Sequence, residues 1–275
     1  MCKKFLLLSI FSLIIITIFV IYSKEYNSIP KNNISDRGKD FTTRSGVDSR
    51  VADLIADINK KNELIKDFFS NKTEVRVWES IHKFKLHGNI NYQKPSNFRL
   101  ELYSVFGKEL DLGSNDEIFW YWSKRDRRPG VYWAKYEDFY KTRLKNPFNP
   151  MFMRATLGFE IIDLKDVIIS QNNVDIMLTY KRKNSMDQTI FFSIIANKFR
   201  KQIDGFIISD SQNNTLATCE IQERNGEAPS KILYSWNEEK RTMLIDLNNC
   251  FTNKNLNQST FDIPDLAPKI NMANE

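Results

Sequence analysis

Residues 81–92 have the sequence IHKFKLHGNINY, and this stretch decides the fold class. Its even positions are mostly apolar and its odd positions mostly basic or amide-bearing; the even positions are His82, Phe84, Leu86, Gly88, Ile90 and Tyr92. Successive side chains of a β-strand point to opposite faces of a sheet, so this alternation indicates a strand with one buried face. Phe98, Leu100 and Leu102 alternate with polar neighbours in the same way, which predicts a second strand directly after the first.

Short strands also follow this pair along the chain. The predicted strands are 117–123, 130–134, 174–181, 189–195, 199–209, 215–222, 231–236 and 242–247. Several are separated by Asn-Asn or Lys-Asn pairs, which favour tight turns. Strands joined by short turns pair antiparallel, so a sheet meander is favoured over alternating strands and helices.

Two helices are predicted. Apolar residues recur at helical spacing from Val51 to Phe69, which predicts a helix of about five turns with one apolar stripe. A second, short helix is predicted at 151–157, after the Pro147–Pro150 turn. The expected fold class is therefore α+β, with one domain over residues 48–265 and a C-terminal tail over 266–275.

The N-terminus has the pattern of an export signal. Residues 5–22 are almost entirely apolar and follow Lys3 and Lys4, so residues 1–23 are long enough for an uncleaved signal anchor. A cleaved signal peptide is the alternative, although the expected pair of small residues at the cleavage site is absent. Residues 24–47 show no sustained apolar period, which predicts a flexible tether or, alternatively, an irregular arm packed on the domain.

Composition excludes several classes of protein. Of 275 residues, 27% are charged and 13% aromatic, which is too charged for a polytopic membrane protein and too aromatic for a disordered chain. Three Cys and two His exclude a four-thiolate zinc site and a three-histidine metal centre. The formal net charge is only +6 and no nucleic-acid motif is present, so no nucleic-acid partner is expected.

Catalytic and metal sites are not indicated. No nucleophile elbow, zinc-protease helix, phosphate loop or Cys-x-x-Cys motif occurs, and His82 and His87 fall on opposite faces of one strand. The oxygen-rich residues 111–117 predict a tight loop rather than a calcium site. We expect a protein that is not an enzyme and that has no cofactor and no metal. Two questions stay open: whether Cys219 and Cys250 pair, and whether the basic residues 124–128 bind phosphate groups or form a solvated hairpin tip.

Four short stretches resemble the LolA-like lipoprotein carriers. They are residues 89–100 (NINYQKPSNFRL), 113–122 (GSNDEIFWYW), 147–158 and the Phe-x-x-Pro of 261–264. The resemblance implies an unclosed antiparallel β-barrel with helices over its concave face, where the family holds acyl chains. It also implies that the basic residue before the early Pro, here Lys94, helps to control the lid.

This resemblance makes specific residues candidates for a hydrophobic cavity and its lid. The candidate lining residues are Phe84, Leu86, Ile90, Phe98, Leu100, Trp120 and Trp122. The candidate lid residues on the first helix are Leu54, Ile58, Leu64, Ile65 and Phe68. For each lining residue, ordinary core packing is an equally open interpretation.

The expected function is a non-catalytic binding protein for a lipid or lipoprotein acyl chain in envelope trafficking. The signal anchor predicts a single-pass protein of the inner membrane with its main domain in the periplasm. Cleavage of the signal would instead give a soluble periplasmic protein. The alternative function is a structural or interaction protein of the envelope whose cavity is filled by its own helix, with its protein partner left open.

Overall fold

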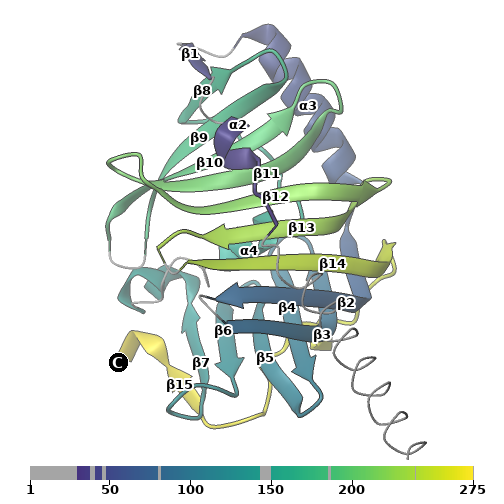
Figure 1. The fold of residues 1–275 in the computed structure, drawn as a ribbon, viewed down its shortest axis with the longest axis vertical. Helices are drawn as coiled ribbons and strands as arrows, with labels where there is room; N and C mark the ends of the chain where they lie inside the picture. The colour runs from purple at the N-terminus through teal and green to yellow at the C-terminus, as the bar shows by residue number, and fades with distance from the viewer. Residues whose placement is uncertain are drawn as a thin grey trace, which may run out of the picture. The chain divides into compact units, whose positions relative to one another are not determined.

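The structure, a computed structural model, describes residues 30–37, 41–44, 48–79, 82–142, 150–184, 187–238 and 240–274. Its described strands form one 15-stranded sheet in the order β1-β8-β9-β10-β11-β12-β13-β14-β2-β3-β4-β5-β6-β7-β15 (Figure 1). Their pairings are antiparallel except that of β15 with β7, and the edge strands β1 and β15 do not pair with each other. The predicted fold class, a mostly antiparallel unclosed β-barrel with few helices, is confirmed.

The elements have the following bounds. The strands are β1 (Thr42–Arg44), β2 (Asp67–Glu79), β3 (His82–Gln93), β4 (Asn97–Ser104), β5 (Gly107–Ser114), β6 (Ile118–Ser123), β7 (Val131–Lys135), β8 (Val167–Gln171), β9 (Asp175–Lys183), β10 (Thr189–Asn197), β11 (Gln202–Asp210), β12 (Thr215–Asn225), β13 (Ala228–Trp236), β14 (Arg241–Thr252) and β15 (Lys269–Asn271). The helices are α2 (Ile34–Arg37), α3 (Ser49–Glu63) and α4 (Pro150–Ala155), with 3-10 turns η2 (Tyr136–Lys141), η4 (Gln258–Phe261) and η5 (Met272–Asn274).

The alternation that predicted β3 defines the two faces of the sheet. Ile90 lies opposite Leu100, which lies opposite Leu112, which in turn lies opposite Tyr121, so these apolar side chains share one face. We call this the inner face, because the main hydrophobic core packs on it, and the other the outer face. His82 and His87 lie on opposite faces of β3, as expected, opposite Glu79 and Glu74 of β2.

Helix α3 covers one part of the inner face. Asp48 caps its N-terminus by accepting a hydrogen bond from the backbone N–H of Arg50. Val51, Ile55 and Ile58 form its buried stripe, which packs with residues of β8, β9 and β10 such as Ile169, Ile176, Leu178 and Ile194. The helix is therefore fixed by apolar contacts with the strands on the β1 side of the sheet.

The predicted helix is too long at its C-terminus. Helix α3 ends at Glu63, and Phe68 and Phe69 already belong to β2. The polar run Lys60-Lys61-Asn62-Glu63 interrupts the apolar stripe before it reaches the aromatic pair. Strand β2 then pairs along its length with β14 and β3, and these tertiary hydrogen bonds override the apparent helical spacing.

Helix α4 fills the middle of the inner face and confirms the predicted mid-chain helix. Phe152 stacks on Phe192 of β10 at 5.2 Å between ring centroids, and Phe192 in turn lies 5.1 Å from Phe206 of β11. The chain after α4 continues the packing with Leu157 and Phe159, both buried in the main core. The two predicted helices thus both lie on the inner face of the sheet.

The segment predicted as a flexible tether contains packed residues. Ile34 in α2 is buried against Ile195 and Ile207, whose positions place them on the outer face. Arg37 forms ion pairs with Asp175 and Asp204, and β1 pairs with β8. For residues 32–37 and 42–44, these contacts favour the alternative of an arm packed on the domain.

The predicted signal anchor at 1–23 lies outside the described residues. Of the helices within the described ranges, none is both long and apolar enough to cross a membrane.

Candidate ligand-binding cavity

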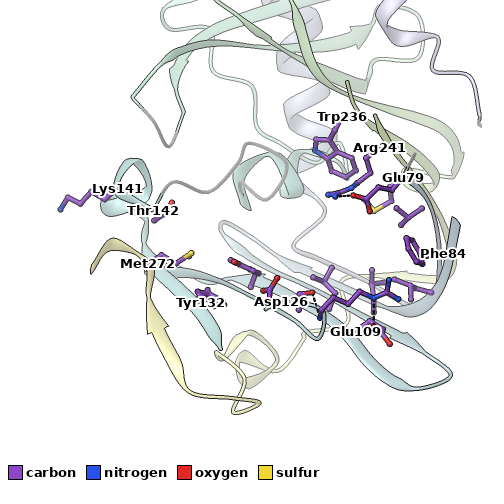
Figure 2. Close-up of a pocket in the computed structure, with 18 residues that line it drawn as sticks. Glu79, Phe84, Glu109, Asp126, Tyr132, Lys141, Thr142, Trp236, Arg241 and Met272 are labelled. Atoms are coloured by element: carbon purple, nitrogen blue, oxygen red, sulfur yellow. Dashed lines mark hydrogen bonds and ion pairs between the residues drawn. The ribbon is translucent and has the colours of Figure 1, made fainter. Parts of the chain in front are cut away.

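A cavity of about 750 Å³ opens on the inner face, where β2 to β7 meet β13 and β14 (Figure 2). Its walls come from the inward positions of these strands and from the C-terminal turn η5. The apolar and aromatic lining residues are Val77, Phe84, Leu86, Leu102, Leu110, Tyr121, Tyr132, Trp236, Met243 and Met272. Such a lining suits an apolar ligand, because a chain entering it exchanges water for apolar contacts.

Charged residues also line this cavity, and four of them form two pairs of opposite sign. The guanidinium of Arg241 lies 2.5 Å from the carboxylate of Glu79. That of Arg125 lies 3.4 Å from Glu109, and both pairs are drawn in Figure 2. Arg125 also lies over the ring of Phe84, at 4.5 Å from its centroid. Burial raises the pKa of the Asp126 carboxyl, the other acidic group of the lining. The two ion pairs leave the apolar wall beside them available to a neutral chain, whereas the buried Oδ2 of Asp126 has no hydrogen-bond partner among the described residues.

Five of the predicted lining residues lie on the inner face, but only two of them line the cavity. Phe84 and Leu86 are half-buried and contribute to its wall. Ile90, Phe98 and Leu100 are fully buried in the main core, which also contains the buried residues of α4. These three residues therefore pack in the core, which was the alternative interpretation.

Trp120 and Trp122 do not line the cavity. They share a face with Gly113 and Asp111 of β5, which is the outer face, and it is Tyr121 and Ser123 that point inward. The indole of Trp120 occupies the space beside Gly113, where an added Cβ would lie 2.3 Å from the ring. Strand β6 has aromatic residues at both parities, so alternation alone did not show which face was inward; the small residue opposite Trp120 was the available signal.

Sequence reasoning missed most of the cavity wall. Val77 precedes the first strand whose bounds were predicted, and Leu110 lies in β5, which was not predicted. Trp236 and Met243 lie in predicted strands, but their closeness to β3 depends on the pairing of β14 with β2. That pairing joins segments far apart in the chain, and no local pattern specifies it.

The predicted lid lies elsewhere on the inner face. Leu54 and Ile58 are in α3 and pack in the cluster with β8 to β10, and no α3 residue is among the described cavity lining. Leu64 follows the helix and is exposed, whereas Ile65 and Phe68 are core residues outside it. The apolar residues at helical spacing therefore belong partly to a helix and partly to a strand, and they do not form a single lid.

A hydrogen bond from Lys94 connects the C-terminal end of α3 to the sheet. The ammonium group of Lys94 donates this hydrogen bond to the backbone carbonyl of Asn62, in the last turn of the helix. The side chain of Asn62 donates to the carbonyl of Glu160 at 2.8 Å, which ties the same turn to the segment after α4. Burial lowers the pKa of Lys94, and the carboxylates of Glu63 and Glu160 oppose this shift.

The Lys94→Met variant is expected to lose about 1 kcal/mol of stability. It removes a cationic donor from a helix C-terminus, where positive charge is favourable, and retains most of the apolar stem. Urea unfolding monitored by circular dichroism measures the change. Lys72→Met is the matched control, since Lys72 is an exposed lysine of β2 and is expected to change stability by less than about 0.5 kcal/mol. Equal stability of the two variants would contradict the role of Lys94.

The other polar residues considered as candidate sites are the oxygen-rich stretch 111–117 and the two cysteines Cys219 and Cys250. Residues 111–114 belong to β5, so the predicted loop is wrong there; Asp111 is fully buried and pairs with Arg99 at 2.8 Å and Lys108 at 2.7 Å. Cys219 and Cys250 are both free thiols, and burial raises the pKa of each. The described part of the chain contains no cluster of three potential metal-ligating His, Cys, Asp or Glu residues.

Comparison with known proteins finds solved structures with a similar fold. No family model matches the chain, and no curated protein does. Among solved structures, a LolA superfamily protein from Nitrosomonas europaea superposes with a TM-score of 0.50 at 8% identity, covering 77% of this chain and 96% of that one. A putative outer membrane lipoprotein-sorting protein domain from Vibrio parahaemolyticus gives 0.52 at 8% identity, covering 76% and 94%.

A DUF1329 family protein from Desulfovibrio piger gives a TM-score of 0.50 at 9% identity, covering 76% of this chain and 95% of that one. At such identities these likenesses establish the fold alone. The chain therefore has a fold similar to that of LolA superfamily proteins, as the resemblance of its short motifs implied.

Proposed function

We propose that this protein is a non-catalytic binding protein that holds the acyl chain of a lipid or lipoprotein in the cavity between β2–β7 and β13–β14. The observation that carries the proposal is the apolar cavity itself, which lies on the inner face and is not filled by α3 or α4. The name of the lipoprotein-sorting domain with a similar fold supports the same ligand class.

The size of the apolar contribution supports useful binding. Burying about ten CH₂ groups at roughly 0.8 kcal/mol each contributes on the order of 8 kcal/mol before the costs of association. The two ion pairs of the lining add little to the free-energy cost of binding an acyl chain, because Arg241 and Arg125 already have carboxylate partners. The proposal therefore requires no charged ligand group inside the cavity.

The proposed place of action is the cell envelope. Residues 1–23 would anchor the protein in the inner membrane, and the domain would act in the periplasm in lipid or lipoprotein trafficking. A soluble periplasmic protein, released by cleavage of the signal, would use the same cavity. Lys94 would then stabilise the covered part of the inner face by holding the end of α3, rather than opening a lid over the cavity.

Titration with a sixteen-carbon fatty-acyl probe (about the length of a membrane acyl chain) tests the proposal on the full chain. Trp236 lines the cavity and stacks on Tyr234 at 4.2 Å between centroids, so its fluorescence is expected to change as the probe binds. The change is expected to saturate, to disappear in Trp236→Phe, and to persist in Trp122→Phe, whose ring lies on the outer face. A folded wild-type protein without saturable binding would overturn the proposal.

The second candidate function is an envelope structural or interaction protein whose cavity is self-filled. It is favoured by the packing of Ile90, Phe98 and Leu100, which fill part of the inner face with the chain's own side chains. A folded protein that binds no acyl probe would support this candidate instead.

A further inference from the structure

The turn between β4 and β5 carries two highly exposed apolar residues. Val105 is 93% exposed and Phe106 is 82% exposed. The turn is well ordered by its own contacts: the backbone N–H of Phe106 donates to Ser104 Oγ at 3.0 Å, and Ser104 Oγ donates to Glu109 at 2.6 Å. Gly107 follows with a φ of 100°, which glycine adopts without strain. The two apolar side chains are thus held outward by a defined turn.

A basic loop lies beside this turn. Lys124 Nζ donates to the carbonyl of Phe106 at 2.8 Å, which joins the loop 124–128 directly to the apolar turn. The side chains of Arg127 and Arg128 are exposed in the same loop. We call Val105, Phe106 and residues 124–128 the apolar-basic tip. With Glu109 included, the tip has four basic and two acidic groups, a net charge of 4 − 2 = +2.

The tip is continuous with the wall of the cavity. Arg125 and Asp126 of the basic loop line the cavity, together with Glu109, which both Lys124 and Arg125 approach within 4 Å. A surface that binds the tip is therefore brought close to the cavity wall.

We propose that the apolar-basic tip docks on a bilayer surface that contains anionic lipid. Val105 and Phe106 would enter the boundary between headgroups and acyl chains, and the cations would lie among the lipid phosphates. Two exposed apolar residues form a patch far smaller than a stable protein interface requires, whereas an apolar turn beside basic residues is complementary to an anionic membrane. The docked orientation brings the part of the cavity wall formed by Arg125 and Asp126 close to the lipid.

A fluorophore sensitive to polarity, attached at position 105 in Val105→Cys, tests the proposal on the full chain. The background carries Cys2→Ser and Cys250→Ser, since Cys219 is fully buried and does not compete for the label. The chain is reconstituted into phosphatidylcholine vesicles with and without phosphatidylglycerol. The matched control carries the label in Phe199→Cys, because Phe199 is 77% exposed but lies in a different turn, between β10 and β11.

With phosphatidylglycerol, the emission of the label at position 105 is expected to shift to the blue, and the label at position 199 is expected not to respond. Arg127→Glu combined with Arg128→Glu is expected to reduce the inserted fraction at least about fivefold, because each basic residue near an anionic surface contributes about that factor. No shift at position 105, or an equal shift at both positions, would overturn the docking proposal. The result is independent of probe binding in the cavity, which the acyl titration measures separately.

Discussion

Leu86→Glu is expected to abolish acyl-probe binding and to leave the domain folded. Leu86 is half-buried and lines the cavity, so a glutamate there places a carboxylate where the chain would lie. Desolvating that charge is unfavourable enough to weaken binding at least about a hundredfold, or about 3 kcal/mol. The titration that monitors Trp236 measures the affinity, and far-ultraviolet circular dichroism checks that the variant is folded.

His87→Glu is the matched control for this prediction. His87 is the next residue of β3, is exposed, and lies on the outer face opposite Glu74, so the same charge is introduced without entering the cavity. Its probe affinity is expected to equal that of the wild type. If the two glutamate variants bind the probe equally well, the cavity is not the binding site.

Arg37→Met is expected to give the largest loss of stability, about 3 kcal/mol. Arg37 bridges Asp175 and Asp204, whose carboxylates are almost completely inaccessible to solvent. Removing one partner of a buried ion pair leaves charge without full compensation, and such changes typically destabilise by about 3–5 kcal/mol. The hydrogen bonds that Asp204 retains with Arg200 and Gln202 place the expectation at the lower end of that range.

Urea unfolding of the full chain measures this loss. Arg50→Met provides the control, since Arg50 is an exposed arginine in the first turn of α3 and no ion pair to it is found among the described residues. Its effect is expected to stay within about 0.5 kcal/mol. A small effect of Arg37→Met would mean that the arm at residues 32–37 contributes little to folding, as a flexible tether would.

The sequence allowed the fold class to be predicted because most strands are amphipathic. The alternation in β3 and β4 and the turn residues between the later strands are local signals, and they indicated an antiparallel meander correctly. Strand β2 was partly assigned to a helix because Phe68 and Phe69 continue the spacing of the α3 stripe. Only its pairing with β3 and β14, the latter distant in sequence, specifies a strand.

The cavity was less predictable than the fold. Phe84 and Leu86 were found because β3 has one clearly apolar face. Trp120 and Trp122 were assigned to the wrong face because Phe119 and Tyr121 are equally apolar, and residue size cannot decide the orientation of such a strand. Trp236 and Met243 reach the cavity through long-range strand order, which single-sequence periodicity does not contain.

The most direct test of the binding proposal is mass spectrometry of what co-purifies with the full chain extracted from its own membranes. We expect an acylated lipid or lipoprotein in near-stoichiometric amount with the wild type and its loss with Leu86→Glu, while His87→Glu retains it. A folded wild-type protein that carries no acylated molecule, or carries the same amount in the Leu86→Glu variant, would contradict the assignment of the cavity as an acyl-binding site.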